Sequence, residues 1–255
     1  MKKITSVLLC ALLACVCLLV SCGVPAMKQE GVGFRNPKTG ITYFPAPANY
    51  GAQKAEGAEA YARIARNGVD ELLFYPVEGM NPDQYLVTAN GTLLYAEGLK
   101  MPTLSELPVK EIGLYDTQVG SNSANITKAD TITAIKEGWE NNPACTYQEL
   151  WLLQSFTSYD LRFFGSGAYS GLYFRLQYLL FEEDACVYVL IEDEASFEDL
   201  YPGIPYEFET FTGPDASGNE VTERYAVYNF GKELIFDSVT GKCRMVGASL
   251  ASLVQ

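Results

Sequence analysis

Alternating apolar and polar positions dominate the second half of the chain, from Tyr159 onward. Such period-two alternation is typical of strands that bury one face, and short polar or glycine-containing segments separate the runs. We expect strands at residues 160–164, 172–181, 186–191, 206–211, 221–230, 234–237 and 243–246. This half of the chain therefore predicts a sheet built from hairpins.

Two further hairpins are expected in the first half of the chain. Residues 34–44 place Asn36-Pro37 and Gly40 where a turn would start and close, between two apolar runs. Residues 85–97 carry Asn90-Gly91, a pair typical of a type I′ turn because both residues accept positive φ angles. Both segments add antiparallel strands to the predicted fold.

Helix patterns are fewer and shorter than strand patterns. Residues 52–67 are rich in Ala, Glu, Lys and Arg, which favours a helix. Ile132 and Ile135 recur at helical spacing after the cap-like Thr127–Asp130, which predicts a second helix, and residues 103–107 indicate a single capped turn. The expected fold class is α+β, mainly antiparallel β-sheet with two or three short helices.

A segment rich in Ser, Asn and Gly, residues 117–126, is the expected internal boundary. It separates an N-terminal α+β lobe, residues 34–117, from a C-terminal β-rich lobe, residues 126–247, unless the two form a single domain. Residues 22–33 show no packing pattern and indicate a tether, and residues 247–255 indicate a tail.

A weak internal match bears on the same question. A gapless shift of 93 positions lays Tyr85–Leu107 over Tyr178–Leu200 with four identities. The match allows two related lobes, but similar hairpins need similar residues in any case, so one sheet-rich domain stays an alternative.

One stretch differs from everything that follows it. Ile4–Val20 has 17 residues without a charge and comes directly after Lys2 and Lys3. A membrane-spanning helix needs about 20 apolar residues, so this run lies at the short limit. A positive start before an apolar segment fits a secretory leader, and we expect residues 1–21 to direct export.

The end of that run, Leu19-Val20-Ser21-Cys22, resembles the lipobox of bacterial lipoproteins at all four positions, and the resemblance ends there. It implies that residues 1–21 are removed and that the Cys22 thiol carries a diacylglyceryl group. Two acyl chains hold a protein stably where one does not, at roughly 0.8 kcal/mol for each buried CH₂. The chain would then face the extracytoplasmic side of the cell membrane, with the membrane as a partner through the lipid on Cys22; an uncleaved N-terminal helix is the alternative.

Charge and composition narrow the chemistry of the remaining chain. Lys2 and Lys3 leave with residues 1–21, so Lys and Arg number 18 − 2 = 16 against 31 Asp and Glu, a formal charge of −15. An acidic surface without a basic patch argues against nucleic acid as a partner. The absence of histidine excludes Ser-His-Asp and Cys-His catalysis and histidine metal sites. We predict no cofactor, no metal and no catalytic residue.

Three cysteines follow Cys22 in the chain. Cys145, Cys186 and Cys243 are far apart and form no C-x-x-C motif. We expect core thiols, with one disulfide allowed, rather than a metal site with three thiolates.

Aromatic residues are numerous, with 17 Tyr, 13 Phe and 2 Trp. Tyr169, Tyr173, Tyr178 and Tyr188 gather in one strand region and are the candidate ligand-binding residues. In a sheet such rings usually pair across strands over a half-buried face. An exposed row would instead suit stacking on sugar rings or contact with a protein, which makes an envelope glycan or protein the expected partner.

Two kinds of loop were candidates for chemistry. Acidic groups at Glu182-Glu183-Asp184, Glu192-Asp193-Glu194 and Asp215–Glu220 are most simply solvated turns, although carboxylates so grouped can hold Ca²⁺ or cleave glycosides. The loop Gly165–Gly171 approaches G-x-G-x-x-G, but a predicted strand and not a helix follows it, so it indicates a strand connection.

The expected function is that of a membrane-anchored, extracytoplasmic lipoprotein that binds or interacts without catalysis in the cell envelope. One alternative is a solute-binding lipoprotein of a transporter, although such proteins usually carry alternating βα units. The other is an envelope hydrolase that works with paired carboxylates.

Overall fold

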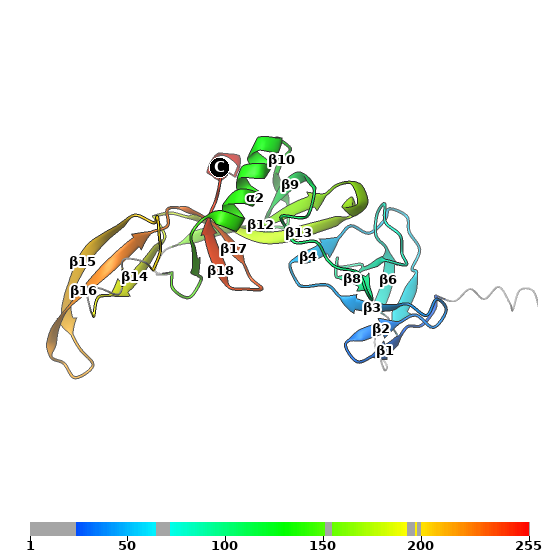
Figure 1. The fold of residues 1–255 in the computed structure, drawn as a ribbon, viewed down its shortest axis with the longest axis horizontal. Helices are drawn as coiled ribbons and strands as arrows, with labels where there is room; N and C mark the ends of the chain where they lie inside the picture. Colours follow the sequence, from blue (N-terminus) through cyan, green and yellow to red (C-terminus); the bar gives the residue numbers. More distant parts are fainter. Residues whose placement is uncertain (1–23, 65–71, 151–154, 193–196, 198–199, 255) are drawn as a thin grey trace, which may run out of the picture. The chain divides into compact units, whose positions relative to one another are not determined.

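The computed structural model describes residues 24–64, 72–150, 155–192, 197 and 200–254. The chain divides into two compact units (Figure 1). The first holds residues 1–46 and 53–99, and the second holds residues 47–52 and 100–255. Every strand pair in the described ladders is antiparallel, which confirms the expected α+β class with a mainly antiparallel sheet.

The first unit is one seven-stranded sheet in the order β1-β2-β3-β8-β7-β6-β5. Its strands are β1 (Lys28–Glu30), β2 (Gly33–Arg35), β3 (Thr42–Pro45), β5 (Ala62–Ile64), β6 (Leu72–Pro76), β7 (Tyr85–Thr88) and β8 (Leu93–Ala96). Alternate residues such as Tyr43, Phe74 and Leu86 are buried in a common core. The pairs β2–β3 and β7–β8 confirm the two predicted hairpins.

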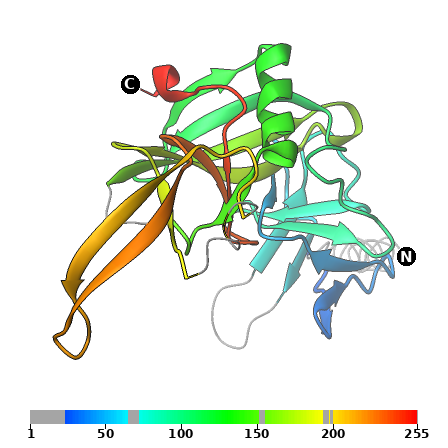
Figure 2. The same cartoon turned by 60° about the vertical axis from the view of Figure 1, so that its left-hand side comes forward.

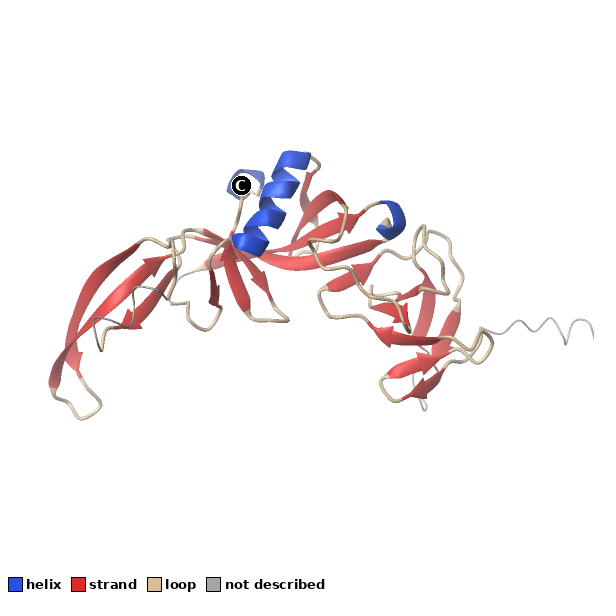
Figure 3. Ribbon diagram, in the orientation of Figure 1, coloured by secondary structure: helices blue, strands red, loops and turns tan. Residues whose placement is uncertain are grey.

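The second unit contains an eight-stranded sheet in the order β10-β9-β12-β13-β17-β18-β11, with β4 also paired to β13. Its strands are β4 (Tyr50–Ala52), β9 (Val109–Asp116), β10 (Asn122–Ile126), β11 (Ala144–Thr146), β12 (Phe156–Gly165), β13 (Leu172–Phe181), β17 (Glu233–Asp237) and β18 (Lys242–Met245). Helix α2 (Ala129–Asn141) lies on one face of this sheet (Figure 3). Ile132 and Ile135 of α2 share a core with Leu161 and Phe163 of β12, and each such buried side chain contributes roughly 1.5–3 kcal/mol.

The same unit carries a separate three-stranded sheet in the order β14-β16-β15. Its strands are β14 (Cys186–Leu190), β15 (Tyr206–Pro214) and β16 (Glu220–Asn229). Val187, Ala226 and Tyr228 pack with Leu234 and Cys243 in a second core, which ties this sheet to β17 and β18. The long β15–β16 hairpin extends away from that core (Figure 2).

The predicted helix at residues 52–67 is wrong. Ala52 ends β4, Gly57 has a φ of +68°, and Ala62–Ile64 form β5, while residues 65–67 lie outside the described part of the chain. Ala62 is fully buried opposite Phe74. Pairing with β6 therefore outweighs an intrinsic helix propensity that amounts to only tenths of a kcal/mol per residue.

The β7–β8 turn also differs from the predicted type I′ form. Gly91 has a φ of +85°, and among the described residues only glycines have positive φ angles, so Asn90 does not. The Gly91 N–H donates to the Thr88 carbonyl over 3.0 Å, and the Thr92 N–H donates to the Thr88 hydroxyl over 3.0 Å. One extra residue thus moves the glycine past the turn centre, as in three-residue hairpin loops.

The predicted lobe boundary, tether and tail are placed differently in the structure. Residues 117–121 connect β9 to β10 and residues 122–126 form β10, so this segment lies inside one sheet, and the units divide between residues 99 and 100. Met27 is buried in the first unit and β1 pairs with β2, so residues 24–33 are not a tether. Leu250 is fully buried under the second unit's sheet, so residues 247–254 are not a loose tail.

Of the two alternatives for the weak internal match, the structure does not support a duplication. The first segment is the β7–β8 hairpin. In the second segment, β13 pairs with β12, β17 and β4, whereas β14 pairs with β16 in a different sheet. Similar strand residues therefore occur in two unlike arrangements.

Candidate functional site

The three-stranded sheet offers two faces because side chains alternate along its strands. The register places Leu190 of β14 and Glu209 of β15 on either side of Tyr225 of β16. Residues in these rows share one face, and residues one position along point to the other. Each face can therefore be described separately.

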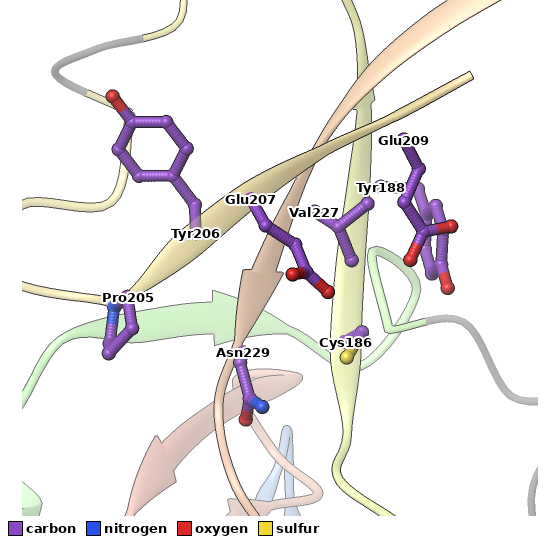
Figure 4. Close-up of a pocket in the computed structure, with 8 residues that line it drawn as sticks. All are labelled: Cys186, Tyr188, Pro205, Tyr206, Glu207, Glu209, Val227 and Asn229. Carbon is purple, nitrogen blue, oxygen red and sulfur yellow. The ribbon is translucent and has the colours of Figure 1, made fainter.

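The first face combines aromatic rings with carboxylates. Tyr188, Phe211 and Tyr225 form a triangle of rings, with centroid distances of 6.1, 6.4 and 5.5 Å. Glu207 and Glu209 lie beside them and line a cavity of about 240 Å³ with Cys186 and Asn229 (Figure 4). We call the five residues Tyr188, Glu207, Glu209, Phe211 and Tyr225 the acidic aromatic face.

The thiol and phenol groups on this side are held in their neutral forms. Burial raises the pKa of Cys186, and the nearby carboxylates of Asp184, Glu209 and Glu207 raise it further. Burial and then Glu209 raise the pKa of Tyr188. A thiol whose pKa is raised is a poor nucleophile. The rings and carboxylates on this face are groups that can contact apolar and cationic partners.

The opposite face of the hairpin also exposes aromatic rings. Tyr206 points to the side opposite Glu207 (Figure 4). It packs at 5.6 Å from Phe208 and at 5.3 Å from Tyr228, while the Arg224 guanidinium lies 4.2 Å from the Phe208 ring centre. On this face of the three-stranded sheet Tyr206 and Phe208 are 41% and 46% exposed, and on the first face Leu190 and Phe211 are 41% and 48% exposed. We call these four residues, two on each face, the apolar hairpin surface.

The outer edge of β15 adds backbone groups to this surface. Within the described ladders β15 pairs with β16 alone, along nine residues from Tyr206 to Pro214. An edge strand presents N–H and C=O groups that can pair with an added strand. Glu207 and Glu209 on that strand place negative charge along the same edge.

A second candidate site lies on the outer face of the eight-stranded sheet, opposite the face that α2 covers. Arg162 of β12 and Arg175 of β13 are cross-strand partners, and Asp160 lies between them. Nε and Nη2 of Arg162 lie 2.8 and 2.7 Å from Oδ2 of Asp160, and Nε of Arg175 lies 3.0 Å from Oδ1. One carboxylate thus balances two guanidinium groups that would otherwise repel each other. We call Asp160, Arg162 and Arg175 the arginine basin.

Aromatic rings and glycines shape the arginine basin. The Arg162 guanidinium lies 4.1 Å from the Tyr115 ring centre and 5.4 Å from that of Tyr173. A Cβ at Gly113 would lie 2.8 Å from the Tyr115 ring, and a Cβ at Gly51 would lie 2.3 Å from the Tyr173 ring. Both glycines therefore make room for the rings that flank the basin, whose cavity measures about 320 Å³.

The structure does not gather the four predicted tyrosines. Tyr173 borders the arginine basin, and Tyr188 belongs to the acidic aromatic face of the other sheet. Tyr178 is fully buried and donates its hydroxyl to Glu233 Oε2 over 2.8 Å, so its ring is not available to a ligand. Tyr169, in the short helix Gly167–Tyr169, packs against the core under α2.

Sequence reasoning missed most of the residues that form these two sites. In β12, Asp160 and Arg162 alternate with the buried Leu161 and Phe163. In β15, two aromatic residues alternate with two glutamates along Tyr206-Glu207-Phe208-Glu209. A period-two pattern of charges or rings on the non-core face was the available signal. It shows which side chains share a face, but not which strands are neighbours.

The loops considered for chemistry have structural roles where they are described. Asp184 accepts from Asn229 Nδ2 over 2.8 Å, and Asp215 accepts the N–H groups of Ser217 and Asn219 over 2.8 Å each. Among the described residues no group of three His, Cys, Asp or Glu side chains is placed to hold a metal ion. Residues 165–171 connect β12 to β13, as predicted, and residues 193–194 of the second acidic group lie outside the described part.

In the described residues no helix has the length and apolar character needed to cross a bilayer; Cys22 and the leader lie outside those residues. No protein-family model, no curated protein and no solved structure matches the chain.

Proposed function

We propose that this chain is a non-catalytic binding protein of the bacterial cell envelope that uses the β15–β16 hairpin to hold a partner protein. The observation that carries the proposal is the exposure of large apolar side chains on both faces of the three-stranded sheet, on the β15–β16 hairpin and at Leu190 of the neighbouring β14. Four of them form the apolar hairpin surface, between 41% and 48% exposed. Aromatic residues that remain this exposed together are typical of protein interfaces.

Charge indicates what kind of partner fits. The two hairpin strands carry Glu207, Glu209, Glu220 and Glu223 against the single cation Arg224, a formal charge of 1 − 4 = −3. Complementary charge favours a partner with a basic surface around an apolar groove, and it raises the association rate at low salt. An acidic edge strand also favours a basic segment that pairs along β15.

The anchor is part of the same proposal. Leu19-Val20-Ser21-Cys22 resembles a lipobox, and a lipid on Cys22 would hold the chain on the extracytoplasmic side of the cell membrane. With the chain anchored in this way, a partner protein bound to the exposed hairpin would be held at the membrane surface.

Variants of the hairpin test the proposal. Phe208→Ser and Phe211→Ser each remove an exposed ring without opening a core, and Val239→Ser, at 50% exposure on the β17–β18 turn, is the matched control. The partner identified with the native chain should bind each hairpin variant at least about 10-fold more weakly, since interface aromatics often contribute over 1 kcal/mol. Equal affinity for native and hairpin variants, measured with purified partner, would remove the proposal.

We also propose a second ligand surface, the arginine basin, because two guanidinium groups meet there beside aromatic rings. Arg175 pairs with Asp160 through Nε, and its side chain is 47% exposed. Planar guanidinium groups match carboxylates, and Thr117 and Gln177 line the same cavity with groups that can bond hydroxyls. The ligand class that fits is a small hydroxylated carboxylate, such as an acidic sugar.

Calorimetric titration distinguishes this ligand class from its neighbours. Galacturonate should bind, whereas neutral galactose should not, and Arg175→Gln should weaken galacturonate binding at least about 10-fold. Arg35→Gln, which makes the same charge change in the other unit, is the control. If Arg35→Gln and Arg175→Gln weaken binding equally, the effect is one of net charge and the basin is not the site.

A further inference from the structure

Two of the three cysteines after Cys22 meet in the structure, on neighbouring strands. In the antiparallel β11–β18 ladder, Cys145 lies directly opposite Cys243. Both side chains are buried, at 3% and 0% exposure, in the core that joins the three-stranded sheet to β17 and β18. Both are free thiols in the structure, and as directly opposite residues they direct their side chains to the same face of the sheet.

The backbone geometry of this pair is compatible with a covalent link. The Tyr147 N–H donates to the Gly241 carbonyl over 2.9 Å, and the Cys145–Cys243 pair lies two residues further along the same ladder, in the equivalent position. Hydrogen-bonded pairs of this kind have Cα atoms about 5.5 Å apart. Disulfides form with Cα separations of about 4.4–6.8 Å.

We propose that Cys145 and Cys243 form a disulfide that fastens β11 to β18. The oxidant is a disulfide of a thiol–disulfide oxidoreductase or of glutathione, the class found outside the cytoplasm. One cysteine thiolate attacks the oxidant and releases one thiol, and the second cysteine then attacks that mixed disulfide and releases the other. Two protein thiols lose two protons and two electrons, and the oxidant gains them as two thiols.

The native environment indicates when this reaction takes place. The neighbouring Cys243 thiol and burial both raise the pKa of Cys145, so the folded protein holds it as an unreactive thiol. Bond formation therefore belongs to folding, before β11 is buried. Once formed, the bond is shielded from reductants by the same core.

Cys186 is excluded from the pair by its position. It lies in β14 opposite Asn229, and its thiol donates to the Asp184 carbonyl over 3.5 Å. It therefore serves as an internal reference that keeps its thiol while the other two cysteines are linked.

The bond would have a consequence for the hairpin sheet. Cys145 and Cys243 are 243 − 145 = 98 positions apart, and the enclosed chain includes β14, β15 and β16. Closing so long a loop restricts the unfolded chain. The link would hold the short edge strand β11 in place at the base of the sheet that carries the apolar hairpin surface.

Refolding the purified protein with a defined oxidant tests the proposal, and the result does not depend on the cellular compartment in which the chain resides. The purified chain is reduced, unfolded in urea and refolded with reduced and oxidised glutathione, and N-ethylmaleimide then blocks the remaining thiols. Peptide mapping should find the Cys145 and Cys243 peptides joined, lighter than their sum by two hydrogen atoms, with Cys186 blocked. The oxidised protein should melt about 5–15 °C above the reduced one.

Serine variants of the cysteines test which pair is linked. Cys186→Ser should still form the link, whereas Cys243→Ser should leave Cys145 blocked by maleimide. Maleimide on both Cys145 and Cys243 after refolding, or a link from either to Cys186, would overturn the proposal. Neither result depends on whether the hairpin binds a partner or whether Cys22 carries lipid.

Discussion

Glu106 caps the single helical turn at residues 103–107, near the start of the second unit. Its Oε2 accepts the Thr103 N–H over 2.8 Å, its own N–H donates to the Thr103 hydroxyl over 3.3 Å, and Oε1 pairs with Lys100 at 2.9 Å. This reciprocal pattern is a capping box. It confirms the capped turn that the sequence indicated at residues 103–107.

A pH dependence follows from this cap. The Thr103 N–H, and then Lys100, lower the pKa of Glu106 from 4.5 to about 2. Since the folded-state pKa lies below the unfolded one, the contribution of this carboxylate is fully present above about pH 4.5 and is lost as pH falls toward 2. Carbon-detected NMR should show Glu106 titrating near pH 2; a midpoint near 4.5 would contradict the cap, and Glu106→Gln should abolish the local change.

The candidate residues show which features of a site can be read from the sequence and which depend on strand pairing. Tyr173 and Tyr178 both lie in β13, but they are five positions apart, so an odd spacing sends them to opposite faces. That parity was readable from the sequence. The position of Arg162 opposite Arg175 could not be predicted, because it depends on the β12–β13 register, which no local pattern encodes.

At the scale of elements, turn chemistry and periodicity predicted most strands, and the errors have a common cause. The hairpins at residues 34–44 and 85–97 are present because glycine and alternating apolar residues fix them locally. The helix prediction for residues 52–67 was wrong because pairing with β6 stabilises the β5 segment more than its intrinsic helix propensity would stabilise a helix. Helix α2 is present, although Lys128 and not Thr127 precedes its first turn and no side chain caps it.

The C-terminal segment gives a prediction at this scale. Leu250 is fully buried with Ile135 and Leu161, and its N–H donates to Glu233 Oε2 over 2.6 Å. Leu250→Ala should lower the free energy of unfolding by about 2–4 kcal/mol because it leaves a cavity in a packed core. Leu253→Ala, at a residue 41% exposed, should cost less than about 1 kcal/mol. Urea unfolding compares the two, and equal costs would mean that this segment is not docked.

At the scale of the whole molecule, the boundary between units was not predictable from composition. The polar segment at residues 117–126 resembles a linker but turns within one sheet, whereas the division after residue 99 has no such signal. Residues 47–52 also leave the first unit to pair as β4 with β13. Pairing between segments far apart in the chain, rather than local flexibility, sets the division.

The proposed anchor belongs to this scale as well. Because Met27 is buried and β1 begins at Lys28, the folded part starts within a few residues of Cys22. Cys22→Ala should move the chain from the membrane to the soluble exported fraction, or leave it unprocessed, since no acyl chain would then hold it. Cys186→Ala is the control. Unchanged detergent extraction of the Cys22 variant would count against lipid anchoring.

The central claim is that the apolar hairpin surface holds a partner protein, and photo-crosslinking in the source cells tests it most directly. Phe208 and Phe211 point to opposite faces of the edge strand β15. A partner that pairs along this edge and covers both faces should therefore be linked to a photoreactive amino acid at either position, and the product should decrease when salt is raised. The same probe at position 239, which is equally exposed, should give no such product. No product from either hairpin position, or the same products from all three, would contradict the account.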